Sequence, residues 1–158
     1  MERLKALPDP TARPQAPAPG RTLRQVLEGC PFFSRVSWSD YPGHGQRAPR
    51  ARATGIFNLD SLVGKASQGR TFTARDRAAL AKAGANLCYV LEYAFPPDKP
   101  LGERSLTAVM IVTMDWSETA QLADDAMLTE IASGVAGDAV LRAVLDAADH
   151  CWARTPSR

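Results

Sequence analysis

The sequence predicts an α+β domain in which several helices pack on one antiparallel sheet. The first observation is a pair of segments, 87–95 and 106–114, whose apolar side chains alternate with a period of two residues, as in β-strands. The second is the link between them, which contains three prolines and a glycine and therefore interrupts regular structure. The third is a set of capping signatures and an apolar stripe that predict helices near 73–84 and 138–152. We therefore expect a long-looped antiparallel hairpin that is packed by helices.

The segment 87–95 also fits the end of a long helix. Apolar residues between 80 and 94 recur at helical spacing, so a helix that starts near Thr73 could extend through the segment. Gly84 and the aromatic and β-branched residues that follow it favour a strand instead. Both interpretations remain open at this level.

The two faces of the predicted hairpin have different characters. We expect Leu91 on a deeply apolar, buried face and Glu92 on the opposite face, where its replacement by alanine should be tolerated. We expect Val90, Val109 and Ile111 on a second apolar face that needs a cover, from the chain's own helices or from a second copy. This expectation favours a symmetric homodimer.

The N-terminal half begins with a segment, 1–20, that has five prolines and few large apolar residues, so we expect a disordered tail. A single globular domain should follow over 21–153. A strand is expected over 32–41, where Val36 and Trp38 share a face. The stretch 42–55 has three arginines, no acidic residue and little apolar character until its end, which predicts a basic mobile loop.

Five helices are predicted, and the strongest local signals are at their N-termini. Thr73 followed by Asp76 is a capping pair, and Asp115 to Glu118 repeats the same pattern. Asp138 is expected to cap the last helix. The residues from 154 to 158 should fray. The helices are expected near 22–28, 58–66, 73–84, 116–133 and 138–152.

Composition bounds the class of protein. A chain of 158 residues with 45% hydrophobic and 23% charged residues is typical of one soluble globular domain. No apolar run is long enough to span a bilayer, and the N-terminus lacks the apolar core of a signal peptide, so we expect a cytoplasmic protein without membrane contact. Three cysteines without a CxxC pair predict reduced, partly buried thiols rather than a disulfide framework.

The sequence contains no recognised catalytic motif. The sequence lacks a phosphate-binding loop, a dinucleotide-binding fingerprint and a nucleophile elbow, and its Cys and His residues do not have the spacing of metal ligands. Neither a cofactor nor a metal is therefore expected. Asp40 and His44 could form a small loop-built active site, but a histidine between two glycines has nothing to orient it. His150 and Cys151 are helix neighbours and point about 100° apart, so they do not face each other.

The distribution of charge is the most informative functional signal. Between 35 and 82 nine basic residues stand against three acidic ones, which gives a net +6. Between 115 and 150 one basic residue stands against eight acidic ones, which gives a net −7. Such charge asymmetry is informative about binding partners rather than about the fold. The two segments could also lie close together and neutralise each other.

We therefore expect a non-catalytic cytoplasmic accessory protein that docks on a macromolecular partner. We expect this partner to be a protein rather than a nucleic acid. The alternatives are a nucleic-acid-binding regulator that uses the basic 47–77 region, and a small enzyme built on Asp40 and His44. The residues expected to contact an anionic partner are Arg47, Arg50, Arg52, Arg70, Arg75 and Arg77. Those expected to contact a cationic partner are Asp124, Asp125 and Glu130.

Overall fold

The computed structural model describes the central part of the chain. Its described residues are 23–41, 44–45, 50–94, 104–113, 117–122 and 125–154. The predicted disordered tail over 1–20 lies outside these residues, as does the predicted frayed end from 155 onward. Arg154, which was expected to fray, is the last residue of a helix.

Five strands form one antiparallel sheet, which confirms the predicted α+β class. The strand order is β1-β2-β5-β6-β7, and all neighbouring strands pair antiparallel. The strands are β1 (Phe33–Tyr41), β2 (Arg50–Phe57), β5 (Asn86–Ala94), β6 (Arg104–Val112) and β7 (Ser117–Leu122). The hairpin predicted from its period of two is therefore the β5–β6 pair at the centre of the sheet, and the alternative of a long helix is wrong.

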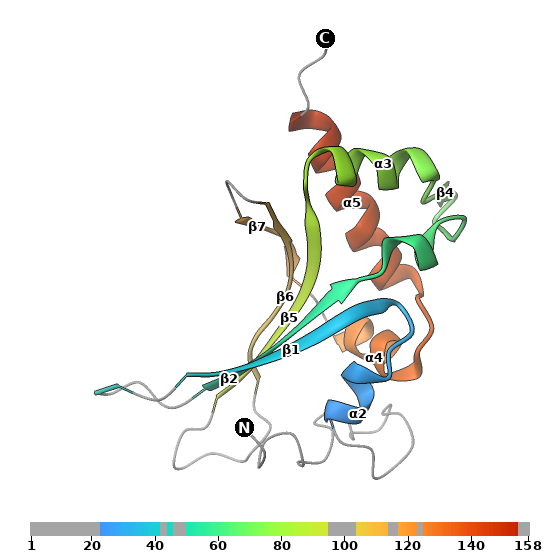
Figure 1. The fold of residues 1–158 in the computed structure, drawn as a ribbon. Coiled ribbons are helices and arrows are strands. Elements are labelled where there is room, and N and C mark those ends of the chain that lie inside the picture. The colour runs from blue at the N-terminus through green and yellow to red at the C-terminus, as the bar shows by residue number, and fades with distance from the viewer. Residues whose placement is uncertain are drawn as a thin grey trace.

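The helices of the described residues lie on one side of this sheet (Figure 1). They are α2 (Leu23–Glu28), α3 (Ala74–Lys82), α4 (Asp125–Ser133) and α5 (Asp138–Arg154). A short 3-10 helix η1 (Leu59–Leu62) and a small hairpin of β3 (Ala66–Ser67) and β4 (Arg70–Thr71) connect β2 to α3. Thr73 and Asp76 form the capping box that the sequence predicts at the start of α3.

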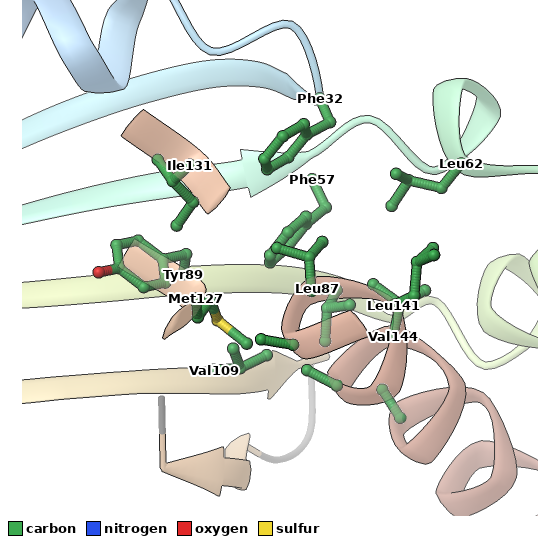
Figure 2. Close-up of a cluster of buried hydrophobic side chains, with 14 of the residues drawn as sticks. Phe32, Phe57, Leu62, Leu87, Tyr89, Val109, Met127, Ile131, Leu141 and Val144 are labelled. Carbon is green, nitrogen blue, oxygen red and sulfur yellow. The ribbon is translucent and has the colours of Figure 1, made fainter. Parts of the chain in front are cut away.

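The hydrophobic core lies between the helices and one face of the sheet. Figure 2 shows Leu87, Tyr89 and Val109 of the central strands packed against Met127 of α4 and Val144 of α5. All five of these side chains are buried. Together with the aromatic residues at the start of β1 and the end of β2, they form one continuous cluster that fixes the helices on the sheet.

One irregularity aligns β1 with this core. The register between β1 and β2 shifts after Phe33, so that one extra residue enters β1 before Arg35. Because of this bulge, Phe33, Val36 and Trp38 all lie on the helix side, and Val36 and Trp38 share a face as expected. The Phe33 ring lies directly over Gly55, where a Cβ atom would come within 2.8 Å of it. Glycine at 55 is what permits this close approach.

The predicted helix over 116–133 is wrong in its first half. Ser117–Leu122 is strand β7, and helix α4 begins only at Asp125. The capping pattern around Glu118 is local, whereas β7 forms because it pairs with the edge of β6. Long-range pairing therefore overrides the local helix signal.

The predicted basic loop and the helix after it also need correction. The second half of the loop, from Arg50 onward, belongs to strand β2, which pairs with both β1 and β5. The helix expected near 58–66 is reduced to the four residues of η1. Asn58 precedes it as predicted, but its side chain makes no capping hydrogen bond. The sequence Ala66–Thr71 forms the β3–β4 hairpin, whose turn has positive φ at Gln68 and Gly69.

Candidate functional site

The second face of the sheet carries no helix among the described elements (Figure 1). We call this surface the open sheet face. Strand register and alternation place on it Arg35, Ser37, Ser39, Arg52, Thr54, Ile56, Cys88, Val90, Glu92, Ala108, Met110 and Val112. Its centre is apolar and its β1 side is polar and basic.

The centre of the open sheet face is buried although it is separate from the core. Val90 and Ala108 are cross-strand partners and are 3% and 1% exposed, yet neither belongs to the core cluster. The expectation that Val109 and Ile111 share a face with Val90 is wrong. Both lie in the core, because Val109 pairs with Tyr89 rather than with Val90. The apolar rim of the open sheet face is formed instead by three half-buried side chains, Ile56, Met110 and Val112.

A hollow of about 460 Å³ adjoins this face at the end of the sheet. Pairing of β2 with β5 ends at Ile56, while β2 continues beside β1 to Phe57, so the two strands separate and leave a fork. The hollow lies at this fork and is lined by Ile56 and by polar residues that include Asn58, Asp60, Arg77 and Asn86. These lining residues provide hydrogen-bonding groups but contain no cysteine or histidine that could act as a nucleophile or base.

An ion pair crosses the open sheet face. Arg52 and Glu92 are direct cross-strand partners, and the Arg52 Nε and Nη2 atoms both donate to Glu92 Oε1, at 2.9 and 2.5 Å. The Glu92 side chain is 5% exposed and the Arg52 side chain 38%. Glu92 lies on the face opposite Leu91, as expected, but its carboxylate is buried and held in an ion pair, which argues against the expected tolerance of Glu92→Ala.

The other arginines expected to bind an anionic partner are placed elsewhere. Arg47 lies outside the described residues, and Arg50 is the first residue of β2. Arg70 binds Asp149 of α5, Arg77 forms an ion pair with Asp60, and the Arg75 guanidinium lies 5.0 Å from the centre of the Trp152 ring. The structure therefore places Arg52 on the sheet, apart from the arginines of β4 and α3, and each of the four described side chains contacts another residue of the protein.

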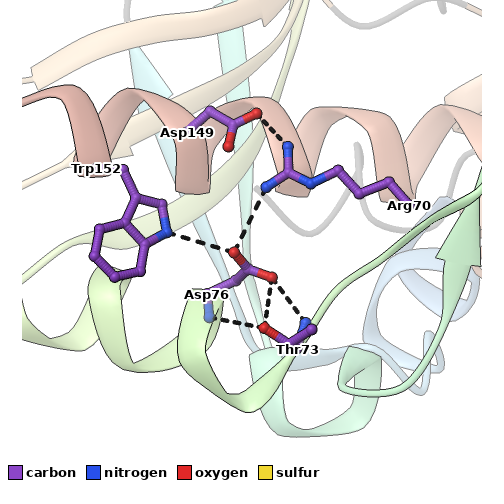
Figure 3. A network of polar contacts seen from close by, with 5 residues as sticks. All are labelled: Arg70, Thr73, Asp76, Asp149 and Trp152. Atoms are coloured by element: carbon purple, nitrogen blue, oxygen red, sulfur yellow. Dashed lines mark hydrogen bonds and ion pairs between the residues drawn. The ribbon is translucent and has the colours of Figure 1, made fainter.

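The contacts of Arg70 belong to a polar network between α3 and α5 (Figure 3). Arg70 also approaches Asp76 at 3.5 Å, and the Trp152 indole donates to the Asp76 carboxylate. Burial alone raises the pKa of Asp76, but hydrogen bonds from Thr73 and Trp152, with the charge of Arg70, bring that pKa below its ordinary value. The basic and acidic segments of the sequence thus meet here through the ion pair between Arg70 and Asp149.

The residues expected to contact a cationic partner are also divided. Asp124 lies outside the described residues, and Asp125 is exposed at the start of α4. The Glu130 carboxylate instead accepts hydrogen bonds from the backbone N–H groups of Gly137, Ala139 and Val140, at 2.8 to 3.1 Å. Glu130 therefore caps the N-terminus of α5, a role that the sequence analysis assigned to Asp138.

The remaining chemical candidates are not brought together among the residues that the structure describes. Asp40 and His44 are both exposed, so neither is desolvated as a buried general base would be. The three cysteines form no disulfide and are buried, and burial raises the pKa of each thiol, to about 11 for Cys30. Among the described residues no group of three or more His, Cys, Asp or Glu side chains could hold a metal ion.

Within the described part of the chain, no helix has the length and apolar character required to cross a membrane. Comparison with known proteins finds no matching family model, no matching curated protein and no matching solved structure.

Proposed function

We propose that this chain is a non-catalytic accessory protein that docks on a protein partner through the open sheet face. The observation that carries the proposal is the apolar rim formed by Ile56, Met110 and Val112, three partly exposed side chains on a sheet face over which the described residues place no helix. Contiguous apolar surface with a polar border is typical of protein-interaction sites. The adjoining hollow supplies a recess that a partner side chain can enter.

The same geometry favours a protein over a nucleic acid. A nucleic-acid site needs several cations directed at phosphates, and its affinity comes mainly from those contacts. Arg70 and Arg77 are engaged by Asp149 and Asp60, which reduces the positive charge that the 47–77 region offers to a phosphate backbone. Arg52 is engaged in the same way, by the buried Glu92 of β5. We also propose that the protein acts in the cytoplasm.

The test is photo-crosslinking from the open sheet face in living cells. A photoreactive amino acid at Ser37, which is exposed and lies opposite Thr54, should give a discrete adduct with another protein. The matched control places the same group at Val135, which is 63% exposed in the turn between α4 and α5.

Equal adducts at both positions, or adducts at Val135 alone, would show that docking does not use this face. An adduct with nucleic acid would select the regulator instead. Loss of the Ser37 adduct on Met110→Asp, with no change on Val135→Asp, would assign the contact to the apolar rim.

A further inference from the structure

We infer that two copies of this chain associate edge to edge, with their β1 strands pairing antiparallel about a two-fold axis at Ser37 to form one continuous sheet. The inference goes beyond the proposed function, because it names a different surface and commits to a second copy of this chain as the occupant. An extended segment of another protein is the competing occupant. The symmetric homodimer that the sequence predicts is thereby assigned to a sheet edge rather than to a sheet face.

The two edge strands of the sheet, β1 and β7, differ in how well they are protected (Figure 1). β7 has six residues and contains a bulge at Ala120, which has no partner in β6. Short length and a bulge are features that hinder pairing with a further strand. β1 has nine residues, and after the bulge at its start Arg35–Tyr41 pair one to one with β2. β1 therefore presents the longer and more regular edge.

The outer side of β1 is suited to accept another strand. No described strand other than β2 pairs with β1, so the backbone N–H and C=O groups of alternate residues are directed away from the sheet. The strand contains neither proline nor lysine, the residue types that commonly prevent pairing at an edge. Arg35, Ser37 and Ser39 are exposed along it. A further strand can therefore extend the sheet at this edge.

A two-fold axis at Ser37 makes β1 complementary to itself. Ser37 is the midpoint of Phe33–Tyr41, so this axis pairs the strand over its full length. In this register Ser37 faces the second copy's Ser37, Val36 faces the second copy's Trp38, and Arg35 faces the second copy's Ser39. Because the axis is perpendicular to the sheet, the helices of both copies lie on the same side and the two open sheet faces become continuous.

The helix side of this interface is apolar. Val36 and Trp38 are partly buried and pack against the edge of the core. The Trp38 indole N–H donates to Glu28 Oε1 at 3.0 Å, which orients the ring against α2 before association. An aromatic residue opposite a β-branched one is a favourable cross-strand pair. An axis at Trp38 would instead place Val36 opposite Asp40, so the side chains favour the axis at Ser37.

The charges of β1 do not oppose this pairing. Arg35 faces a serine, and the two copies of Arg35 are four residues apart along the strands, roughly 14 Å. This separation is longer than the screening length of about 8 Å at physiological salt. The apolar rim of Ile56, Met110 and Val112 lies on β2 and β6, away from this edge. A dimer through β1 therefore does not compete with docking on the open sheet face.

The experiment measures association of the full chain by analytical ultracentrifugation over a wide range of concentration. We expect a dimer that Ser37→Lys and Ser37→Glu each weaken about tenfold or more, because each places like charges directly opposite one another. A mixture of the two variants should restore association, since Lys then faces Glu. Ser37 is exposed, so both variants should keep the fold, which circular dichroism verifies. The control is Ser117→Lys at an exposed position of β7, which should leave association unchanged.

A substitution at Ser39 tests the register. Ser39→Glu places a carboxylate opposite the second copy's Arg35 and should tighten the dimer by about threefold to tenfold. Adding Arg35→Ala to Ser39→Glu should remove this gain. A gain that persists without Arg35 would show that these two positions do not face each other, which would overturn the register.

Three further outcomes would overturn the inference. The first is a monomer at every concentration. The second is an equal effect of Ser37→Lys and Ser117→Lys, or no recovery when the two Ser37 variants are mixed. The third comes from photo-crosslinking at Ser37, where an adduct of twice the chain's mass supports a second copy at this edge. An adduct with another protein alone would remove the dimer and leave the proposed function intact.

Discussion

At the residue scale, the ion pair between Glu92 and Arg52 is the clearest case of a contact that only the folded structure reveals. Their positions in sequence are 40 residues apart, yet they face each other directly across β2 and β5. The unequal exposure of the two side chains predicts unequal effects of their removal.

Arg52→Ala is expected to lower the free energy of unfolding by about 3 kcal/mol, because it leaves the Glu92 carboxylate buried without its cation. Glu92→Ala should cost less, about 1–2 kcal/mol, because the more exposed guanidinium can be hydrated. Replacing both by leucine should be close to neutral. Urea unfolding of the three variants measures these changes in the free energy of unfolding. Equal decreases for the two single variants would contradict the burial of Glu92.

Glu130 gives a second prediction at this scale. Its carboxylate accepts three backbone hydrogen bonds at the start of α5, so Glu130→Ala should lower the free energy of unfolding by about 1–3 kcal/mol. The control is Asp146→Ala on the exposed side of α5, which should change it by less than about 0.5 kcal/mol. A similar effect of both substitutions in thermal or urea unfolding would show that Glu130 is not the cap.

At the element scale, Asp76 joins three segments. It caps α3 through Thr73, approaches Arg70 of β4 and accepts a hydrogen bond from Trp152 of α5. Because these contacts bring the pKa of the folded Asp76 below its ordinary value, ionised Asp76 stabilises the folded state.

This stabilisation should be complete above the unfolded pKa, about 4, and should be lost as the pH falls through the lower folded pKa. Asp76→Asn is therefore expected to reduce the free energy of unfolding by about 1–3 kcal/mol at pH 7 and by progressively less below about pH 4. Urea unfolding at several pH values measures the difference between the two proteins. A difference that does not change with pH would show that the charge of Asp76 contributes nothing.

At the scale of the whole molecule, some of the charges that make the sequence asymmetric are paired within the chain, and others are exposed at its surface. Arg52, Arg70 and Arg77 each form an ion pair with an acid of the same chain, while Arg35 is exposed on β1. The buried thiols of Cys30 and Cys151 report on the packing of the helices on the sheet, because both belong to the core cluster.

Burial raises the pKa of Cys30 from 9.0 to about 11, although hydrogen bonds from the backbone of Phe32 and Phe33 oppose the change. A raised folded pKa means that this stabilising contribution is complete below the unfolded pKa and is lost as the pH rises from about 9 to about 11. The free energy of unfolding should fall less steeply over this range in Cys30→Ala. A thiol reagent at pH 8 should also modify the native protein far more slowly than the urea-unfolded chain, and equal rates would contradict the burial.

Part of the fold could be predicted because local patterns encode it. A period of two over residues 87–94 and 106–112 specifies strands whatever they pair with, and the Thr73–Asp76 capping box specifies the start of a helix. The segment 117–122 could not be predicted, since its strand exists only because β6 offers an edge to pair with. Strand β2 could not be predicted for the same reason, because the composition of the stretch in which it begins is that of a loop.

The sequence by itself determined the α+β class, the central hairpin, the final helix and the absence of a recognised catalytic motif, because these follow from periodicity, capping and residue type. Only the tertiary structure decided which arginines are engaged, that Glu92 is buried, that Glu130 caps α5 and that Val90 and Val109 lie on opposite faces. Each of these depends on contacts between residues distant in sequence, and on strand register, where a shift of one residue moves every side chain to the other face.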